Sequence, residues 1–168
     1  MDGPIQGCRI SPVKQYRDER GWLPLERAYT EGYDLRVTPI AFNGSFHLHV
    51  YPRLRRLLSE VQPDLFHVDE EPYNLATWRA VRLANRQGIP ALFFTWQNLN
   101  RRYPPPFSWI ERDVYRRSAF ALAGNRDAVD VLRAKGYAGP LMLEIEFPAD
   151  PETTIAACQE AKRALLGL

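Results

Sequence analysis

Apolar and polar positions follow two different periods along most of the chain. From Asp34 onward, short runs of β-branched, aliphatic and aromatic residues precede longer segments with helical periodicity, and Pro, Gly, Asn or Asp separates them. This pattern predicts strands over residues 35–41, 64–68, 91–95, 119–123 and 141–145. It predicts helices over residues 52–61, 75–86, 107–117, 126–135 and 151–166.

Two of these strands are apolar without alternation, Leu92-Phe93-Phe94 and Phe120-Ala121-Leu122. Continuous apolar runs are typical of central parallel strands that are covered on both faces. Because crossover connections between parallel strands are right-handed, the alternation of strands and helices predicts an α/β fold with a doubly wound, Rossmann-like parallel sheet.

The remaining segments do not fit this alternation. Residues 38–50 hold two short β-like arms around Asn43-Gly44, and the pattern leaves a hairpin and a long loop as alternatives. Residues 1–33 show no convincing buried strand. We therefore expect an irregular N-terminal segment over residues 1–33, a Rossmann-like domain over 34–150 and a C-terminal helix over 151–168.

Length and composition describe one ordinary domain. The 168 residues are 45% hydrophobic and 25% charged, which suffices for a core but is short for a two-domain enzyme. The net charge of +2 gives no reason to expect a nucleic-acid or membrane-surface partner. Among the 22 basic residues, only Lys14, Lys135 and Lys162 are lysines, and the rest are arginines. Codon bias explains this excess of arginine, and so does the recognition of anions by planar guanidinium groups. Without a signal peptide or an apolar run of about 20 residues, we expect a cytoplasmic protein with no membrane span.

Three polar connections follow predicted strands, at residues 69–74, 96–103 and 124–126. In open α/β sheets, ligands bind outside the carboxyl ends of the strands. These connections supply carboxylates, amides, guanidinium groups and aromatic rings, which are the groups that recognise sugars and phosphates. We therefore place the candidate site there.

The first connection begins with three acids, Asp69, Glu70 and Glu71. In one interpretation, repulsion between these close carboxylates raises the pKa of one of them enough for it to act as a general base. In the other, the three acids only interact favourably with the dipole of the helix that follows. Asn74 is placed to cap the helix that starts at Leu75, and it is also a candidate binding residue.

The other two connections carry amides, a ring and cations. Trp96, Gln97 and Asn98 form either a shelf for hydroxyl groups or a loop whose amides satisfy its own backbone. Arg102 either holds an acidic group or is solvated surface. Asn125 is placed to cap the helix that starts at Arg126 and also borders the candidate site.

No metal or cofactor motif is present. His47 and His49 are spaced to point to one side of a strand, with His67 at the end of another, but no compact ligand motif accompanies them. Phosphate-binding, dinucleotide, metalloprotease and nucleophile-elbow motifs are absent from the sequence. We expect packed or surface histidines, no metal, no cofactor and no nucleic-acid partner.

Three segments together resemble a known family. They are His67-Val-Asp-Glu-Glu-Pro-Tyr-Asn-Leu-Ala-Thr-Trp78, Pro90-Ala-Leu-Phe-Phe-Thr-Trp-Gln-Asn98, and Ala123-Gly-Asn125 with Val131-Leu-Arg-Ala-Lys-Gly-Tyr137. Over about residues 20 to 151, the chain is similar to the N-terminal domain of GT-B retaining glycosyltransferases of the family 4-like group.

This resemblance implies transfer of a hexose from a nucleotide diphospho-sugar to a sugar or glycolipid acceptor, with retention. In such enzymes the first domain binds the acceptor and the second binds the donor. Asp69, Glu70 and Glu71 would position or polarise the acceptor hydroxyl, although many relatives have histidine where Asp69 stands. The residues that would line the acceptor side of the cleft are Asn74, Trp96, Gln97, Asn98, Arg102 and Asn125.

Only 17 residues follow Pro151, too few for a donor-binding domain. We therefore expect a domain that is inactive alone and needs a separate donor-binding domain or subunit. The alternative is a non-catalytic sugar-binding or assembly module that keeps the fold. A hydrolase that uses the three acids is a third hypothesis, but the sequence defines no nucleophile for it.

Overall fold

A four-stranded parallel sheet organises most of the computed structural model, which describes residues 7–12, 15–18, 21–24 and 33–143. The strands run in the order β5 (Phe66–Val68), β6 (Ala91–Thr95), β7 (Phe120–Ala123) and β8 (Leu141–Leu143). Between them lie α2 (Leu75–Arg86), α3 (Phe107–Arg117) and α4 (Arg126–Ala134). This arrangement confirms the predicted α/β fold with a Rossmann-like parallel sheet.

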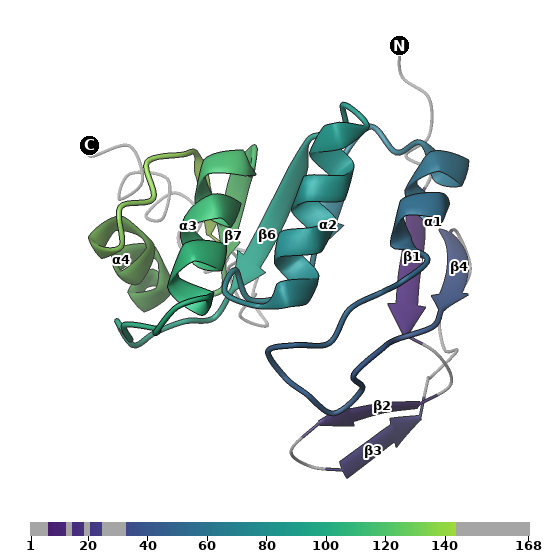
Figure 1. Ribbon diagram of the computed structural model, residues 1–168. Helices are drawn as coiled ribbons and strands as arrows, with labels where there is room; N and C mark the ends of the chain where they lie inside the picture. The colour runs from purple at the N-terminus through teal and green to yellow at the C-terminus, as the bar shows by residue number, and fades with distance from the viewer. Residues whose placement is uncertain (1–6, 13–14, 19–20, 25–32, 144–168) are drawn as a thin grey trace, which may run out of the picture.

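The helices gather on one face of this sheet. Because β5 to β8 are neighbours in sequence order and run parallel, successive right-handed crossovers place α2, α3 and α4 on the same side. Figure 1 shows α2 and α3 in front of β6 and β7. The strand ends that precede these helices therefore all lie at one edge of the sheet.

The first part of the chain contains strands, so the expectation of an irregular segment over residues 1–33 is wrong for its described residues. β1 (Gly7–Pro12) pairs in parallel with β4 (Tyr33–Thr38), and β2 (Gln15–Asp18) forms a hairpin with β3 (Gly21–Pro24). In β1 the apolar side chains stand only at alternate positions, Cys8 and Ile10. A half-buried strand of this kind lacks the continuous apolar run that marks the later strands.

Residues 39–53 form a long loop rather than a hairpin. A single antiparallel bridge joins Ala41 to Val50, and Gly44 adopts a positive φ of 90° in the turn that follows Asn43. The side chain of Asn43 accepts a hydrogen bond from the backbone N–H of Arg17 at 3.0 Å, which ties the loop to β2. The loop leads into α1 (Leu54–Val61), which begins two residues after the predicted start at Pro52.

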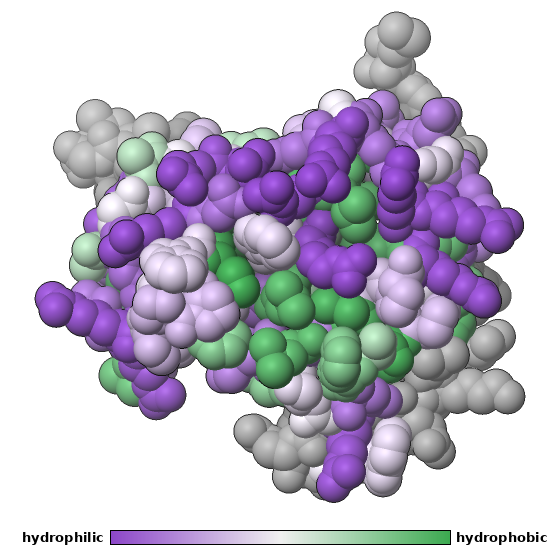
Figure 2. All heavy atoms as spheres, viewed as in Figure 1, coloured by the Kyte–Doolittle hydropathy of each residue, from purple (hydrophilic) through white to green (hydrophobic). Residues whose placement is uncertain are grey.

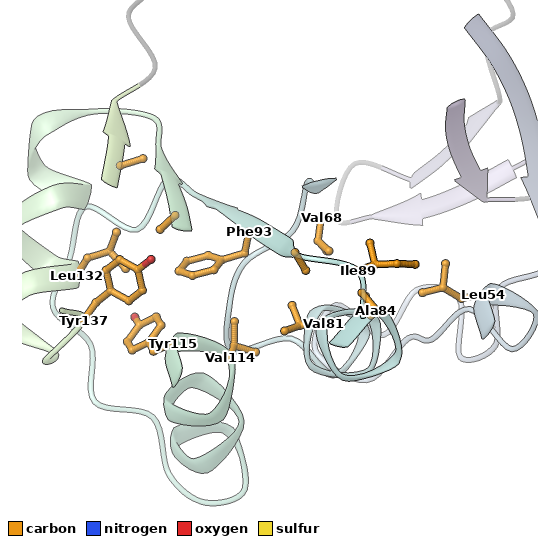
Figure 3. Packing of buried hydrophobic residues seen from close by; sticks show 14 of the residues in the cluster. Leu54, Val68, Val81, Ala84, Ile89, Phe93, Val114, Tyr115, Leu132 and Tyr137 are labelled. Atoms are coloured by element: carbon orange, nitrogen blue, oxygen red, sulfur yellow. The ribbon is translucent and has the colours of Figure 1, made fainter. Parts of the chain in front are cut away.

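The core lies between the sheet and the helices (Figure 3). Phe93 of β6 is fully buried, and its ring stacks on Tyr115 of α3 with centroids 5.7 Å apart. α2 contributes Ala80 and Ala84, whose small side chains allow the helix to approach the sheet closely. Of the helices in the described ranges, none combines the length and the apolar character that crossing a bilayer requires. The predicted C-terminal helix over residues 151–166 lies outside the described residues.

Candidate functional site

The three polar connections follow β5, β6 and β7 at the carboxyl edge of the sheet, as their positions after parallel strands require. The connection after β5 is the most densely hydrogen-bonded of the three, because it contacts both the loop over residues 39–53 and the end of β6. We call the residues of these three connections, together with His47 and His49, the carboxyl-edge site.

Glu70 forms a partly buried ion pair with His49. One carboxylate oxygen of Glu70 lies 2.7 Å from Nε2 of His49 and also accepts a hydrogen bond from the Tyr51 hydroxyl at 3.2 Å. Nδ1 of His49 faces the backbone carbonyls of Ser45 and Phe46 at 3.3 and 3.1 Å. Since both ring nitrogens face acceptors, these contacts favour the doubly protonated imidazolium form of His49. Burial alone would lower the pKa of His49, but the hydrogen bond and charge of Glu70 raise it above its ordinary value.

Asn74 links this ion pair to His47. Its Nδ2 donates to the second oxygen of Glu70 at 3.1 Å, and its Oδ1 lies 3.2 Å from Nδ1 of His47. Because Oδ1 only accepts, Nδ1 of His47 carries the proton in this contact. Asn74 does stand at the N-cap position of α2, but its side chain makes no capping hydrogen bond. The predicted capping role of its side chain is therefore wrong, because the amide is used between Glu70 and His47.

Glu71 connects β5 to the end of β6. Its two carboxylate oxygens accept hydrogen bonds from the Thr95 hydroxyl at 2.7 Å and from the backbone N–H of Trp96 at 2.8 Å. Burial raises the pKa of Glu71 despite these two hydrogen bonds. Both oxygens are thus occupied within the protein, and Glu71 fixes the backbone direction at which the chain leaves β6.

Trp96 presents an exposed ring at this edge. Its side chain is 45% exposed, although it follows a buried strand. The ring lies against Gly124 at the end of β7, where an added Cβ would stand only 2.5 Å from the ring atoms Cδ2 and Cε2. Glycine at this position therefore leaves room for the ring, and the Trp96 backbone is fixed by Glu71.

Gln97 is buried, and both ends of its amide have partners within the protein. Its Nε2 donates to the Tyr103 hydroxyl at 2.9 Å, and its Oε1 accepts from Nζ of Lys135 at 2.9 Å. Lys135 also forms a 2.7 Å ion pair with Glu111, and both of these side chains are only 9% exposed. The amide of Gln97 is consumed by this buried network, which holds the connection after β6 onto α3 and α4.

The remaining predicted residues divide into exposed groups and a cap. Asp69, Asn98 and Arg102 are exposed, and among the described residues none of their side chains has a hydrogen-bond or ion-pair partner. Asn125 caps α4, since its Oδ1 accepts from the backbone N–H of Ala128 at 2.8 Å, as predicted. The three exposed side chains can therefore meet a ligand without breaking a contact.

The loop histidines are the site residues that the sequence did not identify. His47 and His49 lie in the loop over residues 39–53 and not on one side of a strand, and each contacts a different partner. Their separation from Glu70 and Asn74 along the chain hides the pairing, and only the spacing His-x-His gave a signal. Within the described ranges, no three metal-ligating side chains come together.

The comparisons with known proteins agree with this architecture. A family model described as Glycosyl transferase 4-like domain matches residues 6–142. The matched range begins at β1 and reaches β8, so it includes the first strands as well as the carboxyl-edge site. No curated protein matches the chain at a significant level. Because the family model covers most of its 168 residues, the chain belongs to the family of glycosyl transferase 4-like domains.

Proposed function

We propose that the carboxyl-edge site binds the sugar acceptor in a glycosyl transfer reaction. The observation that supports this is the exposed ring of Trp96 held over Gly124, with the exposed polar side chains of Asp69 and Asn98 in the connections at the same edge. A sugar has an apolar C–H face that packs on an aromatic ring and hydroxyl groups that need hydrogen-bond partners. This edge offers both.

The three acids take different roles in this proposal. Glu71 is engaged on both oxygens, so it sets the position of Trp96. Glu70 is engaged by His49, Tyr51 and Asn74, so it positions the loop that carries His47. Asp69 is the exposed member of the three, and we assign it to accept a hydrogen bond from the acceptor hydroxyl.

The family relationship supports the reaction class, a retaining transfer of a hexose from a nucleotide diphospho-sugar. In this proposal the donor is bound by a second domain or subunit that closes over the carboxyl edge. That partner supplies the groups that stabilise the charge of the departing diphosphate. We accordingly propose that the chain alone binds acceptor but does not turn over.

The test compares variants at the carboxyl edge with a control variant at the amino end of β5. Saturation-transfer NMR with glucose, galactose, mannose, N-acetylglucosamine and their octyl glycosides identifies a sugar that binds. Asp69→Ala and Asn98→Ala should each weaken that binding about five- to tenfold, which is the loss of one hydrogen bond. Asp64→Ala removes an exposed acid from the amino end of the same strand and should leave affinity unchanged.

Two results would contradict the proposal. Equal affinity in Asp69→Ala, Asn98→Ala and the parent protein would remove the acceptor site from this edge. Nucleotide-sugar-dependent transfer by the purified chain would show that no separate donor-binding partner is needed. Sugar binding that persists with every candidate donor-binding partner, but never leads to transfer, would favour the non-catalytic sugar-binding module.

A further inference from the structure

Positive charge is concentrated on three neighbouring helices. Together α1, α2 and α3 carry eight arginines and three acids, and one of those acids, Glu111, is buried against Lys135. By contrast, the next helix, α4, has two arginines and two aspartates. The net charge of +2 for the whole chain therefore hides a strongly basic helical face. We call this face, made by the outward side chains of α1–α3, the arginine face.

Helix dipoles do not account for the arginine face. A dipole favours cations in the last turn, which explains Arg86, Arg116 and Arg117. Arg55 and Arg56 instead stand in the first turn of α1, the end at which a helix dipole disfavours cations. They are both exposed there.

Internal ion pairs do not neutralise the arginine face either. Arg56 pairs with Glu60 at 2.6 Å, and Asp113 is shared by Arg82, Arg116 and Arg117 at 2.9 to 3.3 Å, so two carboxylates face four of the eight guanidinium groups. Arg79 and Arg112 form no ion pair with any described residue. Most of this charge is thus available to an anionic partner.

Apolar side chains adjoin the arginine face. The loop before α1 exposes Phe42, Phe46 and Leu48 at 70%, 53% and 46%, and α3 exposes Trp109 at 63%. Figure 2 shows hydrophobic side chains gathered over this loop and the lower end of α2, below a hydrophilic band across the upper parts of the helices. Cations and apolar groups therefore share one side of the molecule.

We propose that this side of the molecule docks on the surface of a bilayer that contains anionic phospholipids. The arginines bind lipid phosphates, for which their planar guanidinium groups are suited. Phe46, Leu48 and Trp109 enter the boundary between headgroups and acyl chains, where aromatic and aliphatic side chains leave water. The docked domain would hold the carboxyl edge close to lipid headgroups.

Two other occupants fit this face less well. A nucleic acid has phosphates that would bind the arginines, but it offers no apolar environment for the exposed side chain of Leu48. Removal of this side chain from water would therefore contribute little to the binding free energy. A second copy of the chain would bring like charges together, which is unfavourable. A bilayer surface satisfies both the charge and the apolar groups.

The experiment is co-sedimentation of the full chain with vesicles. Vesicles of phosphatidylcholine and phosphatidylglycerol in equal parts should bind the chain at low salt, and vesicles of phosphatidylcholine alone should not. Binding should be lost at about 0.5 M salt, because the screening length then falls to a few ångströms. Arg112→Gln should lower the partition coefficient about fivefold, and Arg79→Gln/Arg112→Gln about 30-fold.

Matched controls lie on other parts of the surface. Arg126→Gln removes the same charge from the balanced helix α4 and should bind vesicles like the parent protein. Leu48→Ser should weaken binding several-fold, whereas Leu65→Ser, which removes a leucine with the same 46% exposure, should not. Circular dichroism spectra like that of the parent protein confirm that each variant folds.

Three outcomes would overturn the proposal. The first is equal binding to neutral and anionic vesicles. The second is equal loss of binding in Arg112→Gln and Arg126→Gln. The third is displacement of the vesicles by single-stranded RNA together with no effect of Leu48→Ser, which would identify a general polyanion surface instead of a bilayer contact.

Discussion

The ion pair between His49 and Glu70 makes the stability of the domain depend on pH near neutrality. The folded-state pKa of His49 is raised above its unfolded value of 6.5. The folded protein therefore holds this proton more tightly than the unfolded chain does. Its contribution to stability is fully present below about pH 6.5 and is lost as the pH rises through the folded pKa.

Glu70→Gln should remove this contribution. His49 and Asn74 contact different oxygens of Glu70, at 2.7 and 3.1 Å. An amide places an NH2 group at one of these two positions, so one of the two hydrogen bonds is lost. The loss of a charge-assisted hydrogen bond and the frustrated amide should together cost about 3 kcal/mol at pH 6. The cost should shrink as the pH rises through the folded-state pKa of His49, where the parent protein itself loses the proton.

Urea unfolding across about pH 5.5 to 8.5 measures this effect. The parent protein should lose stability as the pH rises across this range. Glu70→Gln removes the charge that raises the pKa of His49, so that burial, which lowers this pKa, is opposed mainly by the backbone carbonyls of Ser45 and Phe46, and the loss should shrink or disappear. Glu60→Gln, which changes an exposed acid paired with Arg56, serves as the control and should keep the parent's pH dependence. A parent protein without the pH slope, or a Glu70→Gln variant that retains it, would refute the assignment of an imidazolium.

Three further predictions concern the frame of the carboxyl-edge site. Gly124→Ala should displace the Trp96 ring, seen as a red shift of tryptophan fluorescence, and an unchanged spectrum would contradict the close contact. Lys135→Met should lower the free energy of unfolding in urea by about 4 kcal/mol, because it leaves Glu111 buried without its partner. Lys135→Met/Glu111→Leu should recover most of that loss. An equal loss in the two variants would argue against a buried ion pair. Asn125→Ala should lower the free energy of unfolding by about 1 kcal/mol, because the helix cap is lost. Asn125→Asp keeps a capping oxygen and should be about as stable as the parent protein, and a similar loss in both variants would count against capping.

The sequence predicted the later elements well because their signals are local. α2 and α3 have the predicted bounds, and β6 has them too, since continuous apolar runs and flanking Pro or Gly mark these segments. β1 escaped detection because only Cys8 and Ile10 are apolar in it and because it pairs with β4, some 25 residues later. Pairing over such a distance leaves no mark within a short window of sequence.

The sequence predicted which residues lie at the carboxyl edge of the sheet, but not their contacts. Asp69, Trp96 and Asn125 each follow a parallel strand, as the strand pattern indicated. The sequence could not show that Gln97 turns inward to Lys135, or that the Asn74 side chain contacts His47 instead of capping α2. These choices depend on partners 27 to 38 residues away in the chain.

The contact between Trp96 and Gly124 also restricts how this edge can change through evolution. Any residue other than glycine at position 124 places a Cβ 2.5 Å from the ring. A lineage must therefore give up the tryptophan, or accept its displacement, before position 124 can gain a side chain. If position 124 gains a side chain first, the Trp96 ring is displaced from its contact with Gly124. The two positions are therefore expected to change together among relatives.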